Sequence, residues 1–125
     1  MSSILVVDDD TQVLELMSEM LTLEGHAVTA ANNGVEAEDK FVNEHFDLVI
    51  TDLIMPEREG LETIMRLRKC TSMLPIIAIS GGGRIGADDY LESAAQLGAN
   101  ATIAKPFNRS DLVSTVSELL ATAGG

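Results

Sequence analysis

The sequence predicts a doubly wound α/β fold in which a five-stranded parallel sheet is covered by helices on both faces. Three features of the 125-residue chain support this prediction. Short, continuous apolar runs occur five times, amphipathic segments separate them, and carboxylates follow two of the runs. Continuous apolar runs are typical of parallel strands that are buried on both faces, and their alternation with helices is typical of α/β domains.

The first strand and helix illustrate the pattern. The strand is expected over residues 4–7, and the helix follows because apolar residues recur at helical spacing until Gly25, which ends the pattern as a left-handed C-terminal residue would. These apolar residues are Val13, Leu16, Met17, Met20 and Leu21. We interpret the two methionines as core filling rather than as part of a cofactor site.

The other elements follow from the same signals. Strands are expected over residues 27–30, 48–51, 76–79 and 101–104. Helices are expected over about 35–45, 60–70, 87–97 and 110–122, punctuated by Asn33-Gly34, Gly60, Gly86 and Gly98. Right-handed crossovers would place these helices on the two faces of the sheet.

Composition limits the class of protein. The length fits one domain over residues 1–125 without an effector domain. The net charge is −12 and no Lys or Arg precedes Lys40, so most of the surface would repel nucleic acid. The lone Cys70 is compatible with a reducing cytosol, and we interpret it as an inert helix-end residue. With no signal-peptide flank and no apolar run near ~18 residues, we expect a cytoplasmic protein without membrane contact.

Acidic side chains end two of the expected strands. Asp8, Asp9 and Asp10 follow the first strand, and Asp52 follows the third. If these strands are neighbours, each close carboxylate pair repels by roughly 4 kcal/mol at 4 Å with an effective dielectric near 20. Such a cluster requires a cation, and an all-oxygen pocket with open positions suits Mg²⁺. Solvated loop aspartates are the alternative, and the matched placement at two strand ends disfavours it.

Two further polar residues occupy equivalent strand ends. Ser80 follows the fourth apolar run and Lys105 follows the fifth. In a flavodoxin-like sheet of order 2-1-3-4-5, the strand order reverses between the first and third strands, where ligands bind beyond the carboxyl ends. Taken alone, Ser80 and Lys105 are an ordinary turn serine and surface lysine. Together with the carboxylates they would form a receptor for a phosphoryl group and a divalent cation.

With these motifs in order, the sequence closely resembles the receiver domain of two-component response regulators, the family that includes the stand-alone chemotaxis regulator. The resemblance covers residues 4 to about 122. The matching motifs are Ile4-Leu5-Val6-Val7-Asp8-Asp9, residues 47–56 with Gly60 following, Ile77-Ala78-Ile79-Ser80, and Lys105-Pro106-Phe107. Each motif is modest alone, but the ordered set is specific.

The resemblance implies a role for each acidic residue. Asp52 would accept a phosphoryl group from a histidine kinase or phosphotransfer protein, and phosphorylation would switch the binding of a downstream protein. Asp9, Asp52 and the carbonyl of Ile54 would bind Mg²⁺, and Asp8 would support the metal through water. Asp10 lies outside the acidic pair of the family, and we interpret it as a helix N-cap.

The remaining roles concern the phosphoryl group. By the same resemblance, Lys105 would pair with the phosphoryl oxygens, Ser80 would donate its hydroxyl to one of them, and Pro106 would follow a cis peptide. The family implies a phosphoacceptor that assists its own Mg²⁺-dependent phosphorylation and dephosphorylation, rather than an enzyme. It also implies a monomer or a weak, phosphorylation-dependent dimer.

The chain departs from the family at two places. Thr102 stands where the family often carries a Tyr or Phe whose inward rotation reports phosphorylation. Gly81-Gly82-Gly83 follow Ser80, where Ala is common, so this loop should be unusually free before phosphorylation. We therefore expect activation to order residues 81–86 and to reposition the helix that begins near Ala87.

A dinucleotide-binding domain would be a different interpretation of the glycines. Gly81, Gly83 and Gly86 spell G-x-G-x-x-G between a strand and a helix. However, residues 101–107, about 20 positions further on, contain no Asp or Glu, and only one strand follows. The context therefore opposes this interpretation.

The acidic residues also allow two interpretations besides a working receiver. Asp8 and Asp10 suggest an aspartate-nucleophile phosphatase of the haloacid dehalogenase type, but Gln12 stands where that family has Thr or Val, and the chain is short for a catalytic domain with a cap. A degenerate receiver that acts only as an interaction module is opposed by the intact set of site residues.

Overall fold

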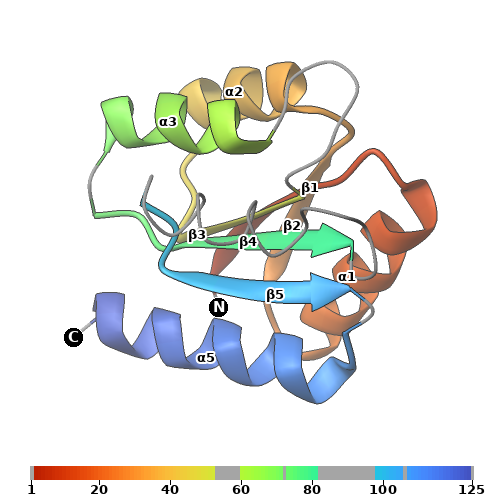
Figure 1. The fold of residues 1–125 in the computed structure, drawn as a ribbon. Helices are drawn as coiled ribbons and strands as arrows, with labels where there is room; N and C mark the ends of the chain where they lie inside the picture. Colours follow the sequence, from red (N-terminus) through yellow and green to blue (C-terminus); the bar gives the residue numbers. More distant parts are fainter. Residues whose placement is uncertain (1, 53–59, 72, 82–97, 106, 125) are drawn as a thin grey trace.

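The structure is a computed structural model that describes residues 2–52, 60–71, 73–81, 98–105 and 107–124. The elements in chain order are β1 (Ser3–Val7), α1 (Thr11–Leu23), β2 (Ala27–Ala31), α2 (Gly34–Asn43), β3 (Leu48–Asp52), α3 (Gly60–Cys70), β4 (Ile76–Gly81), β5 (Ala101–Lys105) and α5 (Arg109–Gly124). All strands are parallel, in the order β2-β1-β3-β4-β5 (Figure 1). This confirms the predicted fold class and strand order. The helix expected over 87–97 lies outside the described residues.

Three strands extend further than their apolar runs. Asp52 is the last residue of β3, β4 continues to Gly81, and β5 includes Lys105. The sequence prediction placed Asp52, Ser80 and Lys105 just after their strands. The difference arises because backbone pairing, such as that of Gly81 with Lys105, needs no particular side chain and continues where the apolar pattern stops.

Capping side chains fix where three helices begin. Asp10, Asn33 and Asn108 each accept hydrogen bonds from backbone N–H groups two or three residues further on, at 2.8 to 3.4 Å. The prediction that Asp10 is an N-cap is therefore confirmed. Gly25, just after α1, has a φ of +92°, which confirms its left-handed role.

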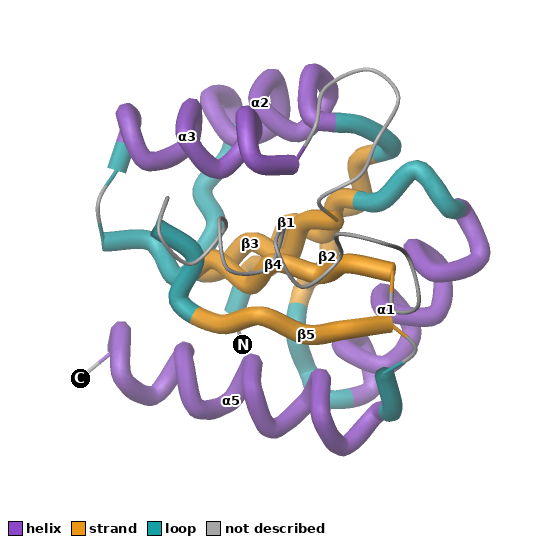
Figure 2. Tube along the Cα trace, viewed as in Figure 1, coloured by secondary structure: helices purple, strands orange, loops and turns teal. Residues whose placement is uncertain are grey.

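The sheet separates two hydrophobic layers (Figures 1 and 2). Side chains alternate along β1, so that Leu5 and Val7 pack in the layer with α2 and α3 while Ile4 and Val6 pack in the layer with α1 and α5. Met17 is fully buried in the second layer, as its interpretation as core filling requires. Both faces being covered explains the continuous apolar runs of the strands.

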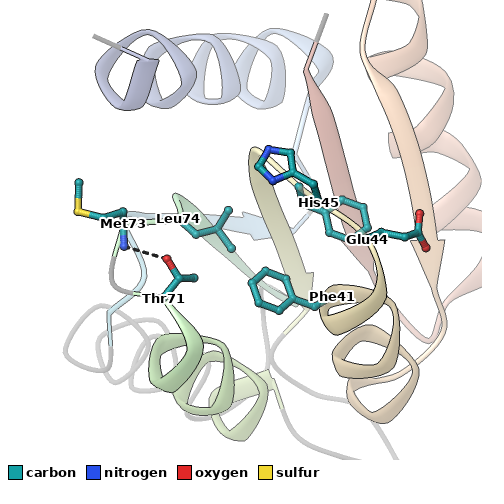
Figure 3. A pocket seen from close by; sticks show the side chains of 7 residues that line it. Phe41, Glu44, His45, Thr71, Met73 and Leu74 are labelled. Carbon is teal, nitrogen blue, oxygen red and sulfur yellow. Dashed lines mark hydrogen bonds between the residues drawn. The ribbon is translucent and has the colours of Figure 1, made fainter.

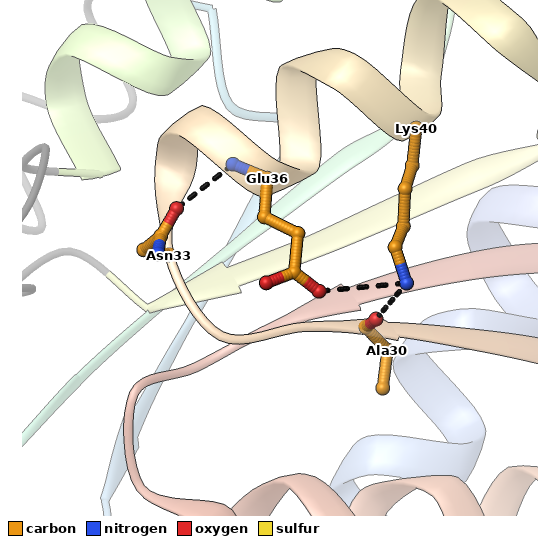
Figure 4. Close-up of polar contacts among 4 residues, drawn as sticks. All are labelled: Ala30, Asn33, Glu36 and Lys40. Atoms are coloured by element: carbon orange, nitrogen blue, oxygen red, sulfur yellow. Dashed lines mark hydrogen bonds and ion pairs between the residues drawn. The ribbon is translucent and has the colours of Figure 1, made fainter.

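One open edge of the sheet is covered by a lysine. The carbonyl of Ala31 in β2 accepts from Asp8 beside β1, so the carbonyl of Ala30 points to the open edge. Lys40 of α2 donates to that carbonyl at 2.7 Å, and its ammonium lies 3.5 Å from the Glu36 carboxylate (Figure 4). A charged side chain held against an edge strand disfavours pairing of that strand with another chain.

Arg68 ties together the amino end of the sheet, opposite the expected site. Its guanidinium donates to the carbonyls of Gly98 (2.7 and 3.0 Å), Leu74 (2.6 Å) and Thr71 (3.4 Å) and to Oδ1 of Asn100 (2.7 Å). Asn100 also exchanges two hydrogen bonds with the backbone of Ile76, at 2.7 and 2.9 Å. The end of α3, the start of β4 and the approach to β5 are thus joined through one side chain. Burial lowers the pKa of Arg68.

Candidate functional site

Asp8 is a fully buried carboxylate at the end of β1. Its backbone N–H donates to the carbonyl of Ala31 at 3.2 Å, and its Oδ1 accepts the N–H of Asp10 at 2.9 Å. Asp10 therefore has two tasks, because its side chain caps α1 while its backbone holds the Asp8 carboxylate. Sequence reasoning found only the cap, although an Asp two residues before another turn residue is a typical signal for such a bond.

Asp52 ends β3 and is 5% exposed. The register pairs Val7 of β1 with Thr51, so that Asp8 and Asp52 come from adjacent positions of neighbouring strands. The buried Thr51 hydroxyl donates to the backbone carbonyl of Asp52 at 3.0 Å, a contact that the sequence did not predict. These strands form the centre of the sheet, so Asp52 has little freedom to move.

Asp9 completes a cluster of three carboxylates. One oxygen from each of Asp8, Asp9 and Asp52 lies within 4.8 Å of the other two, and Asp9 is the exposed member. This confirms that the two strand ends bring their acidic residues together, while Asp10 is directed to the helix cap. The cluster therefore combines one solvent-exposed carboxylate with two buried ones.

The donor set fits a hard divalent cation. All three side chains offer oxygen, which suits Mg²⁺, and a few protein ligands leave positions for water or for a phosphoryl oxygen. A cation among the carboxylates would also offset their mutual repulsion. The cluster therefore has the oxygen ligands that a site for a hard divalent cation requires.

Ser80 and Lys105 lie at the same edge of the sheet. Asp52 pairs with Ile79 of β4, so Ser80 is the next residue beyond the partner of Asp52. Lys105 pairs with Gly81, one strand further from Asp52. The backbone register thus places a hydroxyl residue and a lysine along the edge that carries the carboxylates, in the order expected from the sequence.

Several expected features lie outside the described residues. They are the carbonyl of Ile54, the peptide before Pro106, the glycine loop over 82–86 and the helix over 87–97. Thr102 is described, and it lies exposed on β5 opposite Ala78. The position therefore carries a small polar side chain, as the sequence shows, in place of an aromatic ring.

Comparison with known proteins agrees with this geometry. The family described as response regulator receiver domain matches residues 4–117. The transcriptional regulatory protein CpxR homolog of Haemophilus influenzae is 40% identical over 120 residues, which make up 96% of this chain and 51% of that protein. The chain spans about half the length of the curated relatives it matches.

Solved structures resemble the whole sheet and its helices. The receiver domain protein (CheY-like) from Methanospirillum hungatei superposes with a TM-score of 0.90 at 31% identity, covering 99% of this chain and 97% of that chain. The response regulator TrrA from Thermotoga maritima, in complex with Mg(2+)-BeF, gives a TM-score of 0.85 at 35% identity, with 95% and 99% covered.

Proposed function

The chain belongs to the receiver-domain family of response regulators, and we propose that Asp52 accepts a phosphoryl group from a histidine kinase or a phosphotransfer protein. The observation that supports this most is the buried Asp52 at the end of a central strand, clustered within 4.8 Å with Asp8 and Asp9. A rigid carboxylate beside a metal-binding pair is what an in-line phosphoryl transfer needs.

In this proposal Asp9, Asp52 and the carbonyl of Ile54 would hold Mg²⁺, and Asp8 would support it through water. The metal supplies positive charge that offsets the charge of the transferring group. An oxygen of Asp52 attacks the phosphorus, the bond from phosphorus to the donor nitrogen breaks, and an acyl phosphate forms on Asp52. Lys105 and Ser80 bind the phosphoryl oxygens from the β4 and β5 side.

The consequence of phosphorylation is a switch in partner binding. We infer that the chain is a signalling module of a phosphorelay rather than an enzyme with a separate substrate, and that it assists its own phosphorylation and dephosphorylation. Its curated relatives are named transcriptional regulators, and this chain corresponds to about half of their length. We propose a single receiver domain over 1–125, located in the cytoplasm, that binds proteins rather than nucleic acid. None of the helices in the described part could span a membrane.

The test is labelling by a small phosphodonor. Wild-type protein with acetyl phosphate and Mg²⁺ should acquire one hydroxylamine-sensitive phosphoryl group, Asp52→Asn should acquire none, and the exposed control Asp39→Asn should label like the wild type. Absence of labelling, with the fold intact, would leave an interaction module as the function. Continuous turnover of a phosphate ester would favour the phosphatase, and labelling that survives in Asp52→Asn would refute the assignment.

A further inference from the structure

Thr51 is a buried polar residue directly before the proposed phosphoacceptor. In the described part of the chain, four polar side chains are buried: Asp8, Thr51, Asp52 and Thr63. Two of these belong to the carboxylate cluster, and Thr51, which is fully buried, precedes Asp52 in β3. Burying a hydroxyl costs free energy unless it finds a hydrogen-bond partner, so a threonine at this position requires a physical reason.

The surroundings of Thr51 are apolar. Its neighbours on the adjacent strands are Val7 of β1 and Ala78 of β4, and both are fully buried. Side chains alternate along a strand, so Thr51 points to the same layer as Val49, which is the layer of α2 and α3. Valine has the same branched shape and would fill this place without burying a hydroxyl. Packing alone therefore does not account for the threonine.

The hydroxyl holds the backbone just after Asp52. Oγ1 of Thr51 donates to the carbonyl oxygen of Asp52 at 3.0 Å. This carbonyl belongs to the peptide group that follows Asp52, at the end of β3. The pairing of β3 with β1 ends at Thr51, whereas the pairing with β4 continues one residue further, to Asp52. The hydrogen bond thus adds a constraint at the point where the pairing with β1 has ended.

Fixing this peptide group restricts the side chain of Asp52. The peptide before Asp52 is held by the strand pairing, and the peptide after it is held by Thr51. With both peptides in place, φ and ψ of Asp52 are set, and these angles decide which side-chain rotamers are allowed. The rotamer in turn decides whether an oxygen of Asp52 stays within 4.8 Å of oxygens of Asp8 and Asp9.

The alternation of side chains also separates Thr51 from the carboxylates. Asp52 follows Ile50, which packs in the layer of α1 and α5, whereas Thr51 points to the opposite layer. A phosphoryl donor at the cluster would therefore not contact the hydroxyl of Thr51. Any effect of this hydroxyl on the chemistry has to pass through the backbone of Asp52.

We propose that Thr51 is a positioning residue for Asp52, and this inference rests on the proposed role of Asp52 as the phosphoacceptor. The hydroxyl of Thr51 holds the carbonyl of Asp52, and this keeps the carboxylate directed into the cluster. Phosphoryl transfer depends mainly on positioning and on neutralisation of charge, so a nucleophile that samples other rotamers reacts more slowly.

Labelling by acetyl phosphate and Mg²⁺ tests the hydroxyl separately from the rest of the side chain. Thr51→Val keeps the branched shape and loses the donor, so its initial rate should fall roughly three- to tenfold, as expected for one hydrogen bond. Thr51→Ser keeps the donor and loses a methyl group, so it should label at close to the wild-type rate but melt at a lower temperature than Thr51→Val. A purely structural role predicts the opposite order of rates, because the less stable variant would then be the slower one.

Two other threonines supply matched controls. Thr115 of α5 donates to the carbonyl of Asp111 at 2.8 Å. The hydroxyl of Thr71, at the amino end of the sheet, accepts the N–H of Met73 at 3.3 Å (Figure 3). Thr115→Val and Thr71→Val each remove a hydrogen bond between a threonine hydroxyl and the backbone outside the cluster. Both variants should label like the wild type.

Two further measurements keep the test independent of the valine variant and of labelling. Thr51→Ala and Thr51→Ser differ only in the hydroxyl, so the alanine variant should label roughly three- to tenfold more slowly than the serine variant even if Thr51→Val fails to fold. Titration calorimetry with Mg²⁺ reports on Asp52 as one of the three carboxylates. Thr51→Val and Thr51→Ala should raise the Mg²⁺ dissociation constant severalfold, and Thr51→Ser should leave it unchanged.

The outcomes separate this proposal from the assignment of Asp52. Wild-type rates and Mg²⁺ affinity in Thr51→Val would overturn the positioning role while labelling of the wild type still supports Asp52. A serine variant as slow as the valine or alanine variant would also overturn it, as would equal slowing in Thr115→Val. A wild type that is never labelled, but whose Mg²⁺ affinity depends on the hydroxyl of Thr51, would refute the phosphoacceptor and support the positioning of the carboxylate. A wild type that neither labels nor binds Mg²⁺ would overturn both.

Discussion

Arg68 should contribute more to stability than any other basic side chain of α3. The change Arg68→Ala removes five hydrogen bonds to four acceptors, three of which are backbone carbonyls at the junction of α3, β4 and β5. None of these acceptors is a carboxylate, so Arg68 stabilises the fold by donating several hydrogen bonds from its planar guanidinium rather than by forming an ion pair. The variant leaves the carbonyls of Leu74 and Gly98 to find water in a partly buried place.

The magnitude follows from the geometry. A hydrogen bond to a charged group contributes about 1.5–3 kcal/mol, and three of the five bonds are short, at 2.6 or 2.7 Å. Two effects make the net loss smaller than the sum of these hydrogen-bond energies. Burial of the guanidinium, which lowers the pKa of Arg68, costs free energy in the wild type. In the variant, water can reach some of the carbonyls that Arg68 had contacted. We therefore expect a loss of roughly 2–4 kcal/mol, which for a chain of this length is a fall in Tm of about 8–15 °C.

The assay is urea and thermal unfolding in dilute protein, with Arg66→Ala as the matched control two residues away. Arg66 is 46% exposed and has two ion-pair contacts with Glu38 and Glu62 at 3.6 and 3.4 Å, so its loss should cost less than about 1 kcal/mol. Arg68→Lys should recover little stability, because an ammonium cannot span acceptors on opposite sides of a planar fork. Equal losses in Arg68→Ala and Arg66→Ala, or a Lys variant as stable as the wild type, would refute the reasoning.

Two further predictions concern charge. Mg²⁺ at a hundred times its dissociation constant should stabilise the fold by roughly 2.7 kcal/mol. Asp9→Ala should lose most of that gain in a thermal melt. An unchanged Tm of the wild type in millimolar Mg²⁺ would argue against a preformed site. The hydrogen bond from the N–H of Ser3, more than the neighbouring His45, holds the pKa of Asp47 below its usual value. The ionised Asp47 therefore stabilises the fold at any pH above its unfolded-state pKa. This contribution is lost as the pH falls through the folded-state pKa. The stability difference between the wild type and Asp47→Asn should therefore shrink in acid, and a difference that is constant with pH would contradict this.

Local patterns were enough to predict the elements and the strand ends. The strands are continuous apolar runs because both faces of the sheet are covered, and helix starts are marked by capping residues such as Asp10 and Asn33. The carboxylate cluster was predictable because parallel strands present their carboxyl ends at one edge, so the register of β1 with β3 decides that Asp8 and Asp52 meet.

Contacts between distant residues leave no local signal. Arg68 reaches Gly98 and Asn100, thirty and thirty-two residues away, and backbone carbonyls accept most of its hydrogen bonds. A carbonyl is present at every residue, so no residue type in the sequence marks it as a partner. The exposure of two apolar side chains on α2 and α3 was also missed, because helical periodicity shows which residues can be buried but not that Val42 and Met65 remain exposed.

The two ends of the parallel strands, called here the amino edge and the carboxyl edge of the sheet, differ in their contribution to stability. At the amino edge, where the strands begin, Arg68 and Asn100 make short hydrogen bonds with backbone groups. Asp47 accepts a hydrogen bond from the N–H of Ser3 and so holds the start of β1. At the carboxyl edge, Asp8, Asp9 and Asp52 place like charges within 4.8 Å of one another, which opposes folding unless a cation binds. The hydrogen bonds at the amino edge therefore offset part of the repulsion at the carboxyl edge, and a cation that bound among the three carboxylates would gain affinity by relieving that repulsion.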